Sequence, residues 1–324
     1  MYDVVSIGAA TVDIFVKSSA LTLKKKILSL PASSKNEIED SLICSGGGAT
    51  NSAVSFSRLG LKSTAISLIG QSHLNQYIFN DLKDNKVDSS LIVQDKKDIT
   101  DFSVILVAKD GSRSILTNRG QGGLQEKNIP WQKLTKAKWF YITSLEGNLD
   151  LLEKLIGFAQ EHNIKVSLNP GRRELAQTRR LLPLLQFIDF LLLNQQEAEV
   201  LTQLKHDNKD FFPKIKKINN YLTAITNGRL GAHIFTPDQH FYSPIINVNP
   251  TDETGAGDSF GSTFVTALIR NKTPQQALFW AIKNSASVVA HLGSKTGLLT
   301  LSQINKKTRP ITKKPKLKAK KTSK

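Results

Sequence analysis

Residues Thr251–Phe260 read TDETGAGDSF, and this segment decides how the rest of the chain is interpreted. An apolar run with strand character at 241–248 leads into it, and an amphipathic run at 260–269 leads out of it. A strand, a glycine-rich turn and a helix start form an anion site, because the first N–H groups of a helix have no internal partner and carry the positive end of its dipole. Asp258 is an odd neighbour for an anion. Its position suits a carboxylate that accepts a proton next to a phosphoryl group that is being transferred.

Two simpler interpretations of this segment compete. In the first, Thr254 or Asp258 only caps a helix and the glycines only form a turn. In the second, Gly255, Gly257 and Gly261 belong to a dinucleotide-binding fingerprint, but their spacing is one residue off. That fingerprint also requires an acidic residue about twenty positions later. No Asp or Glu follows Asp258, so the sequence excludes the dinucleotide interpretation.

Composition indicates a globular protein of a reducing compartment. The chain has 324 residues, of which 40% are hydrophobic, enough for one large α/β domain or two smaller ones. A single cysteine, Cys44, excludes an internal disulfide and fits a small buried residue better than a nucleophile. The start, MYDVVSIGAATVDIF, predicts a strand and not a signal peptide, and no apolar run reaches membrane-spanning length. We therefore expect a cytoplasmic location without membrane insertion.

The net charge of +17 is concentrated at the C-terminus. Residues 306–324 contain ten Lys or Arg and no acid, so the rest of the chain carries only +7. This segment has two prolines and few large apolar residues, and it is expected to be a disordered basic tail. Weak attraction to nucleic acid or anionic lipid follows from its charge, but we do not expect a specific nucleic-acid function.

After Gly123 the sequence alternates regularly between strand and helix patterns. The predicted strands are apolar on both faces, which is typical of a mainly parallel sheet covered by helices on both sides. Two helices, at 255–270 and 274–291, close the domain. The strands are expected at 138–142, 164–168, 188–193 and 222–226, with two more within 231–248.

The first third of the chain departs from this rhythm. Residues 14–43 contain a lysine run, a proline and an alternating stretch, and they are expected to form strands and loops that project from the main sheet. Residues 101–117 form a hairpin pattern around the turn Asp110-Gly111. The hairpin is expected to pair with the projecting strands.

Ligands of such α/β sheets bind at the carboxyl ends of the strands. The polar, glycine-rich segments of this chain all fall there, so the candidate chemical residues are expected to meet at one edge of the sheet. The segments are GAATVD (8–13), NPGRR (169–173), NQQE (194–197), TNGRLG (226–231) and DETGAGD (252–258).

Two of these features together resemble the ribokinase-like (PfkB) carbohydrate and nucleoside kinases. The early motif of that family is matched by 46–51, GGGATN, and the late motif by 252–258, DETGAGD. The resemblance covers about residues 1–300. It implies a three-layer α/β fold with a mainly parallel sheet and a small β-sheet lid. The expected kinase domain is 1–305, with the lid formed from about 14–43 and 98–120.

The resemblance implies a phosphoryl transfer from ATP to a hydroxymethyl group of a small sugar or nucleoside. Asp258 would be the general base on the acceptor hydroxyl. The N–H groups of Gly255, Ala256 and Gly257 would form the anion hole that stabilises charge on the transferred group. Substrate hydroxyls would be held by three residues, Asp13, Gly47 and Asn51.

The same resemblance assigns the nucleotide and metal sites. Glu197 would hold Mg²⁺ through water, although Asn194 and Glu197 could equally form a helix capping box. Asp252 would belong to a site for K⁺ or a related monovalent cation. ATP would contact Asn194, Thr226, Gly228, Gly231 and Asn284.

Departures from the family pattern limit what can be said of the substrate. Asn169 stands where related sugar kinases carry an aspartate, and Gly48 stands where ribokinases carry a lysine. One alternative is a phosphosugar kinase, with Arg113 and Arg119 as basic donors in the lid. Another is an inactive nucleotide-binding protein that uses the basic tail. Edge strands of the lid could pair in a homodimer.

Overall fold

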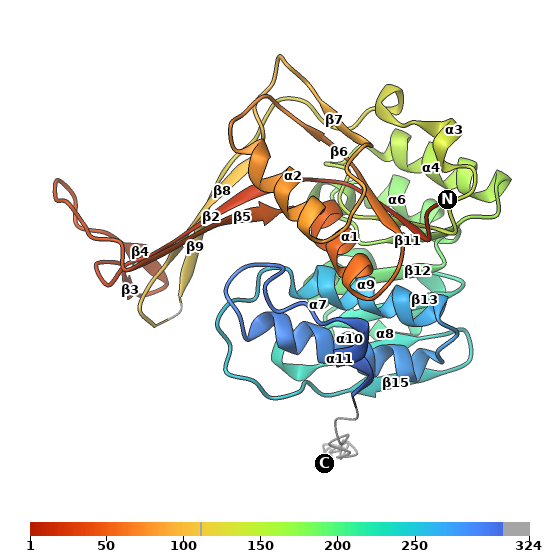
Figure 1. Ribbon diagram of the computed structural model, residues 1–324. Coiled ribbons are helices and arrows are strands. Elements are labelled where there is room, and N and C mark those ends of the chain that lie inside the picture. Colours follow the sequence, from red (N-terminus) through yellow and green to blue (C-terminus); the bar gives the residue numbers. More distant parts are fainter. Residues whose placement is uncertain (111, 307–324) are drawn as a thin grey trace, which may run out of the picture.

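The computed structural model describes residues 1–110 and 112–306 (Figure 1). The predicted basic tail, 306–324, lies outside these residues except for Lys306. Within the described chain a nine-stranded sheet forms the centre of the molecule. In spatial order its strands are β15 (His240–Ser243), β14 (Ala232–Phe235), β13 (Leu222–Thr226), β12 (Phe190–Asn194), β11 (Lys165–Leu168), β10 (Trp139–Ile142), β1 (Val4–Ile7), β6 (Ser63–Ile69) and β7 (Ile92–Gln94).

The sheet is parallel from β13 to β7, and at the other edge β14 pairs antiparallel with both β13 and β15. All four residues of β1 and of β10 are buried, as expected for strands covered on both faces. The prediction of a mainly parallel, doubly covered sheet is therefore confirmed.

Helices cover both faces of the sheet, and β10 shows how its side chains divide between them. Phe140 and Ile142 join one hydrophobic core, while Trp139 and Tyr141 join the other. The first core includes residues of α4 (Leu149–Glu161), α6 (Thr178–Leu185), α7 (Gln195–Thr202) and α8 (Phe211–Ile218), and the second includes residues of α1 (Gly48–Arg58), α9 (Ala256–Ile269), α10 (Pro274–Val289) and α11 (Leu301–Asn305). The remaining helices are α2 (Asn75–Asp84), α3 (Trp131–Leu134), α5 (Arg172–Leu175) and the short 3₁₀ turns η1 (Glu126–Asn128) and η2 (Gly228–Leu230).

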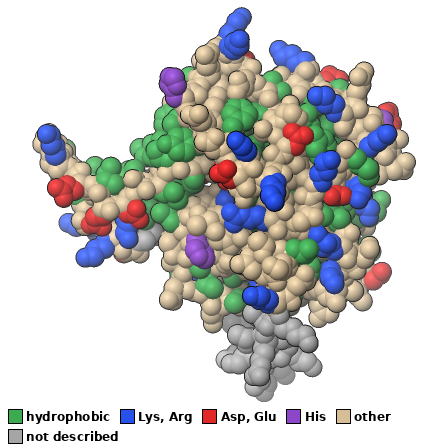
Figure 2. Space-filling model, in the orientation of Figure 1, with side chains coloured by type: hydrophobic (Ala, Val, Ile, Leu, Met, Phe, Trp, Pro, Cys, Tyr) green, Lys and Arg blue, Asp and Glu red, His purple; other side chains and the backbone are tan. Residues whose placement is uncertain are grey.

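A second, smaller sheet projects from the body of the molecule, and we call it the lid (Figure 1). Its four strands in the described chain are β5 (Asp40–Gly46), β2 (Thr11–Lys17), β8 (Phe102–Val107) and β9 (Arg113–Asn118), in that order. The pairing of β2 with β8 confirms that the projecting strands and the hairpin pair. A further hairpin, β3 (Thr22–Lys24) and β4 (Ile27–Ser29), extends the lid away from the body. Figure 2 shows charged side chains of both signs along the outer part of the lid.

The strand expected immediately before the glycine-rich segment ends earlier than predicted. β15 stops at Ser243, and residues 244–255 contain neither helix nor strand. Pro244 and Pro250 explain the difference, since proline has no N–H for a sheet ladder. The apolar residues of 245–248 therefore belong to a connection that leads from the sheet edge to helix α9. No helix in the described residues is both long enough and apolar enough to cross a bilayer.

Candidate active site

The early and late glycine-rich motifs meet because the helices that follow them pack together. Helix α1 begins in the early motif and α9 begins in the late one, and a hydrogen bond of 2.7 Å joins Ser262 Oγ to Ser55 Oγ between them. Near the start of both helices, Asn51 Nδ2 donates to Asp258 Oδ2 over 2.8 Å. Ser294 Oγ donates to Asn51 Oδ1 over 2.9 Å, which fixes the orientation of the amide.

Asp258 does not cap its helix. The N-cap of α9 is Gly255, and no side chain in the described chain caps this helix by a hydrogen bond. The carboxylate of Asp258 is used across the site instead. Burial raises the pKa of Asp258 above its usual value, while the hydrogen bond from Asn51 and the positive charge of Lys295 act to lower it. A carboxylate in this position is a stronger proton acceptor than an exposed one.

The loop before α9 has the geometry of an anion site. Gly255 has φ +75°, and a Cβ there would lie 2.6 Å from Ser294, so only glycine fits. Gly257 is exposed, and a Cβ on it would meet no atom within 4 Å. The N–H of Ala256 donates to Glu253 O over a long 3.3 Å. The first N–H groups of α9 have no partner within the helix, and that of Ala256 is only weakly engaged.

Asp13 lies beside the early motif, to which Gly47 belongs. Gly47 has φ +91°, and a Cβ there would come within 2.4 Å of Ala9 O, so the backbone approaches the turn after β1 closely. Asp13 is buried, and burial raises the pKa of its carboxyl while the charge of Lys295 acts to lower it. Asp13, Gly47 and Asn51 therefore stand on one side of the site, from lid strand β2 and the start of α1.

A cavity of about 630 Å³ lies on the other side of the α9 N-terminus. Four of the five residues predicted to contact ATP line it, namely Asn194, Thr226, Gly228 and Gly231, together with Ala256 and Gly257 from the start of α9. The fifth does not. Asn284 is fully buried, and its amide joins Thr263 Oγ1 at 2.7 Å and the N–H of Leu299 at 2.8 Å. Its observed contacts hold α9, α10 and the chain after 298 together.

Asn194 and Glu197 form the capping box that the sequence allowed. Asn194 Oδ1 accepts from Glu197 N at 2.9 Å, and Glu197 Oε2 accepts from Asn194 N at 2.8 Å. Burial raises the pKa of Glu197. Within residues 1–110 and 112–306 no cluster of three or more acidic, His or Cys side chains is present. A single carboxylate such as Glu197 supplies too few oxygen ligands for an all-protein magnesium site, so water and phosphate would have to provide the others.

The carboxylate of Asp252 is already occupied by protein donors. Its Oδ1 accepts from Arg113 Nη1 and from the N–H and hydroxyl of Thr254, and its Oδ2 accepts from Gly293 N. A monovalent metal ion bound through this side chain would have to replace the guanidinium of Arg113. The side chain of Asp252, as arranged here, does not fit a metal ligand.

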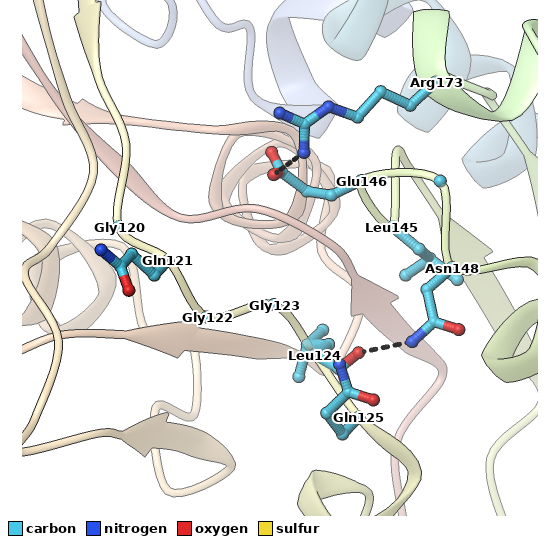
Figure 3. Close-up of a pocket in the computed structure, with 11 residues that line it drawn as sticks. Gly120, Gln121, Gly122, Gly123, Leu124, Gln125, Leu145, Glu146, Asn148 and Arg173 are labelled. Carbon is cyan, nitrogen blue, oxygen red and sulfur yellow. Dashed lines mark hydrogen bonds and ion pairs between the residues drawn. The ribbon is translucent and has the colours of Figure 1, made fainter.

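A second cavity, of about 490 Å³, lies next to the loop 120–125 (Figure 3). Glu146 borders it with a left-handed backbone, φ +60°, and its two oxygens bind Arg119 and Arg173 separately. The N–H groups of Gln121 and Gly122 both donate to Asp98, so these two hydrogen-bond donors are already used within the protein. Sequence reasoning missed Glu146, although it follows strand β10 at the same edge of the sheet.

Lys295 is the other residue that sequence reasoning missed. The string Gly293-Ser294-Lys295-Thr296 does not match the spacing of a phosphate-binding P-loop. The ammonium of Lys295 is buried and reaches Ser45 O at 2.8 Å, Thr50 Oγ1 at 3.1 Å and Asp81 Oδ2 at 3.0 Å. A lone lysine within an apolar C-terminal stretch is the signal that could have indicated a buried ion pair.

Comparison with known proteins gives a consistent result. The family model described as pfkB family carbohydrate kinase matches residues 1–301. The chain is 26% identical to the ribokinase of Staphylococcus aureus (strain COL) over 316 residues, which cover 93% of this chain and 98% of the relative. It is 25% identical to the nucleoside kinase of Methanocaldococcus jannaschii over 263 residues, 80% and 83% of the two chains.

Solved structures agree at the level of the fold. Arabidopsis thaliana ribokinase, solved with ribose and ATP, superimposes with a TM-score of 0.75 at 18% identity, over 94% of this chain and 97% of that one. At this identity the similarity shows a shared architecture. Other ribokinase structures match with comparable scores, such as that from Thermotoga maritima at 0.76.

Proposed function

Because the chain belongs to the pfkB family of carbohydrate kinases, which are phosphotransferases acting on sugar or nucleoside hydroxyls, we propose that it transfers the γ-phosphate of ATP to a hydroxymethyl group of a small sugar or nucleoside. The observation that carries this proposal is the hydrogen bond between Asn51 and Asp258. It joins the motif that resembles a substrate site to the motif that resembles a phosphoryl-transfer site.

In this mechanism Asp258 is the general base. Its Oδ2 is held by Asn51, which leaves Oδ1 for the acceptor hydroxyl. Burial raises the pKa of Asp258, so that the carboxylate takes up the hydroxyl proton more readily as the oxygen attacks the γ-phosphorus. A general base typically contributes on the order of 10²–10⁴ in rate.

In the proposed complex, the anion hole and the nucleotide site face the reacting phosphate from the side opposite the acceptor hydroxyl. The N–H groups of Gly255, Ala256 and Gly257 stabilise the charge on the transferred phosphoryl oxygens. ATP occupies the 630 Å³ cavity, which is lined by Thr226, Gly228 and other predicted contacts. A magnesium ion, when bound, would neutralise phosphate charge, and Glu197 would hold it through water.

The acceptor lies between the body and the lid. Asp13 accepts and Asn51 donates hydrogen bonds to hydroxyl groups, a combination that suits a polyol. The lid segments 14–43 and 98–120, within a kinase domain of 1–305, cover the acceptor and exclude water, which would otherwise compete as phosphoryl acceptor. Pairing of lid edges in a homodimer is a separate prediction, to be measured by sedimentation.

The test is a combined thermal-shift and ADP-release screen. The full chain is assayed with ATP and Mg²⁺ against ribose, fructose, adenosine, other nucleosides and hexose phosphates. We expect ADP release with at least one sugar or nucleoside, and none with the Asp258→Asn variant under the same conditions. If every acceptor fails, the nucleotide-binding, non-enzymatic alternative gains support.

The phosphosugar kinase alternative is disfavoured, because the two arginines proposed to bind the substrate phosphate form ion pairs within the protein. Arg113 is bound to Asp252, and Arg119 is bound to Glu146. Each guanidinium therefore already has a carboxylate partner, and Arg113 lines the 630 Å³ cavity proposed for the nucleotide instead of the acceptor side. A hexose phosphate that outperforms every neutral sugar in the screen would reverse this preference.

A further inference from the structure

We propose that Arg113 of the lid supplies the positive charge required by Asp252, so that closing the lid completes the phosphate-binding loop without a free monovalent cation. The inference uses the proposed function only to identify residues 252–258 as that loop. Arg113 positions the loop through Asp252, and its remaining N–H donors also face the cavity proposed for the nucleotide.

The contact spans two parts of the fold. Arg113 is the first residue of lid strand β9, and 139 residues separate it from Asp252. Its Nη1 binds Asp252 Oδ1 and lies 3.2 Å from Thr254 Oγ1. The Asp252 side chain is only 3% exposed, and that of Arg113 is 30% exposed. The lid therefore delivers a cation to a carboxylate that water hardly reaches.

Asp252 in turn holds the loop in place. Besides Arg113, it accepts from Thr254 N at 3.0 Å, Thr254 Oγ1 at 2.7 Å and Gly293 N at 3.1 Å. The carboxylate thus links the start of the late motif to the turn after α10. A buried carboxylate whose cation is removed is strongly destabilised. Because Arg113 is its only ion-pair partner in the described chain, lid opening would weaken this arrangement.

Arg113 also borders the cavity proposed for the nucleotide. Its side chain lines the 630 Å³ cavity together with Gly228, Ala256 and Gly257. A guanidinium carries five N–H donors, and the hydrogen bonds found among the described residues use only Nη1. The remaining donors are available to an anionic group in the cavity. A phosphate there would hold the lid closed, and the closed lid would hold the loop that binds the phosphate.

The first experiment measures ADP affinity by calorimetry in buffers that contain either K⁺ or tetramethylammonium. We expect the wild-type affinity to be the same in both. Arg113→Ala should bind ADP at least tenfold more weakly in tetramethylammonium, and guanidinium or K⁺ should restore part of the loss. Lys109→Ala, an exposed residue of the same hairpin, is the matched control and should behave as wild type.

Two further variants separate coupling from misfolding. Arg113→Lys keeps the charge and should fall between wild type and Arg113→Ala. Asp252→Asn removes the need for a cation, so the double variant with Arg113→Ala should lose less affinity than the two single losses combined. The inference is overturned if the losses of ADP affinity in the two single variants are fully additive in the double variant. It is also overturned if Arg113→Ala binds ADP like wild type, or if the wild-type protein requires K⁺ to bind ADP.

ADP binding needs no acceptor, so the two proposals fail separately. If no sugar or nucleoside is phosphorylated but ADP binding depends on Arg113 as described, the coupling stands and the kinase proposal falls. If an acceptor is phosphorylated and Arg113→Ala retains wild-type ADP affinity in tetramethylammonium, the kinase proposal stands and the coupling falls.

Discussion

Asn51 and Asp258 are hydrogen bonded over 2.8 Å, although 207 residues separate them in the chain. The bond orients the carboxylate by one oxygen and leaves the other for a ligand. It also places an amide donor beside a carboxylate that burial makes more basic. Both halves of the proposed reaction, acceptor binding and proton removal, therefore depend on a single contact between helices α1 and α9.

Replacing Asp258 with Asn should slow turnover by orders of magnitude and keep nucleotide binding. Loss of a general base predicts a fall in kcat on the order of 10²–10⁴, with the Kd for ADP changed little. The two values come from steady-state assays and calorimetry. A variant with near-normal kcat would contradict the assignment of the base.

The same variant should unfold at a higher temperature. The folded-state pKa of Asp258 is raised, so the folded protein binds the proton more tightly than the unfolded chain, and ionisation at neutral pH costs stability. Asparagine removes that cost without changing the shape of the side chain. Scanning calorimetry at pH 7 and near pH 3 should show the gain only at the higher pH.

Replacing Asn51 with Ala should move the acidic limb of the pH–activity profile. The hydrogen bond from Asn51 lowers the pKa of Asp258, so its removal raises that pKa further. Because the base acts in its ionised form, activity should then begin to fall at a higher pH than in wild type. The profile of kcat/KM between pH 5 and 8 measures the shift. An unmoved limb would indicate that Asp258 is not the titrating group.

Replacing Lys295 with Met should destabilise the fold. The substitution leaves Asp81 without its ammonium partner, and Asp81 is 24% exposed, so we expect the lower end of the range for broken buried pairs, about 3 kcal/mol. Urea denaturation measures the loss. Adding Asp81→Asn should recover part of it, and a double variant as unstable as the single one would argue against the ion pair.

Two histidines at the sheet edge predict acid sensitivity. His233 Nδ1 and His240 Nε2 lie 2.9 Å apart, and burial, with the neighbouring imidazole, lowers the pKa of His233 from 6.5 to about 4. The unfolded chain binds the extra proton between these values, so the free energy of unfolding should fall as pH falls from about 6.5 to about 4. His233→Gln should flatten this slope, and His73→Gln, at an exposed site, should not.

Removing the residues after Asn305 should leave turnover unchanged. No residue assigned to the site belongs to the basic segment, and the charge of this segment predicts only weak, salt-dependent association with polyanions. Steady-state kinetics of the shortened chain, with and without added RNA at low salt, test this. A loss of kcat on truncation would place the segment in the mechanism.

Much of the fold could be predicted from local pattern. Apolar runs such as FLLL at 190–193 and the regular spacing of strands and helices indicated a parallel sheet with two helical layers. The DETGAGD segment indicated a helix start with an anion site, and Asn194, Thr226, Gly228 and Gly231 proved to line one cavity. Short-range features predict well because helix caps, glycine turns and strand periodicity depend on neighbouring residues.

The partners of the charged side chains were decided only by the tertiary structure. Nothing local to Arg113 indicates that it meets Asp252, 139 residues away, or that Lys295 meets Ser45, 250 residues away. Asn284 shows the same limit, since its neighbours Thr263 and Leu299 come from other elements. The sequence by itself determined the fold class, the two motifs and the edge of the sheet where they meet. Packing of the helices and the lid decided which groups share that edge, because a buried charge takes its partner from whatever the fold brings within reach.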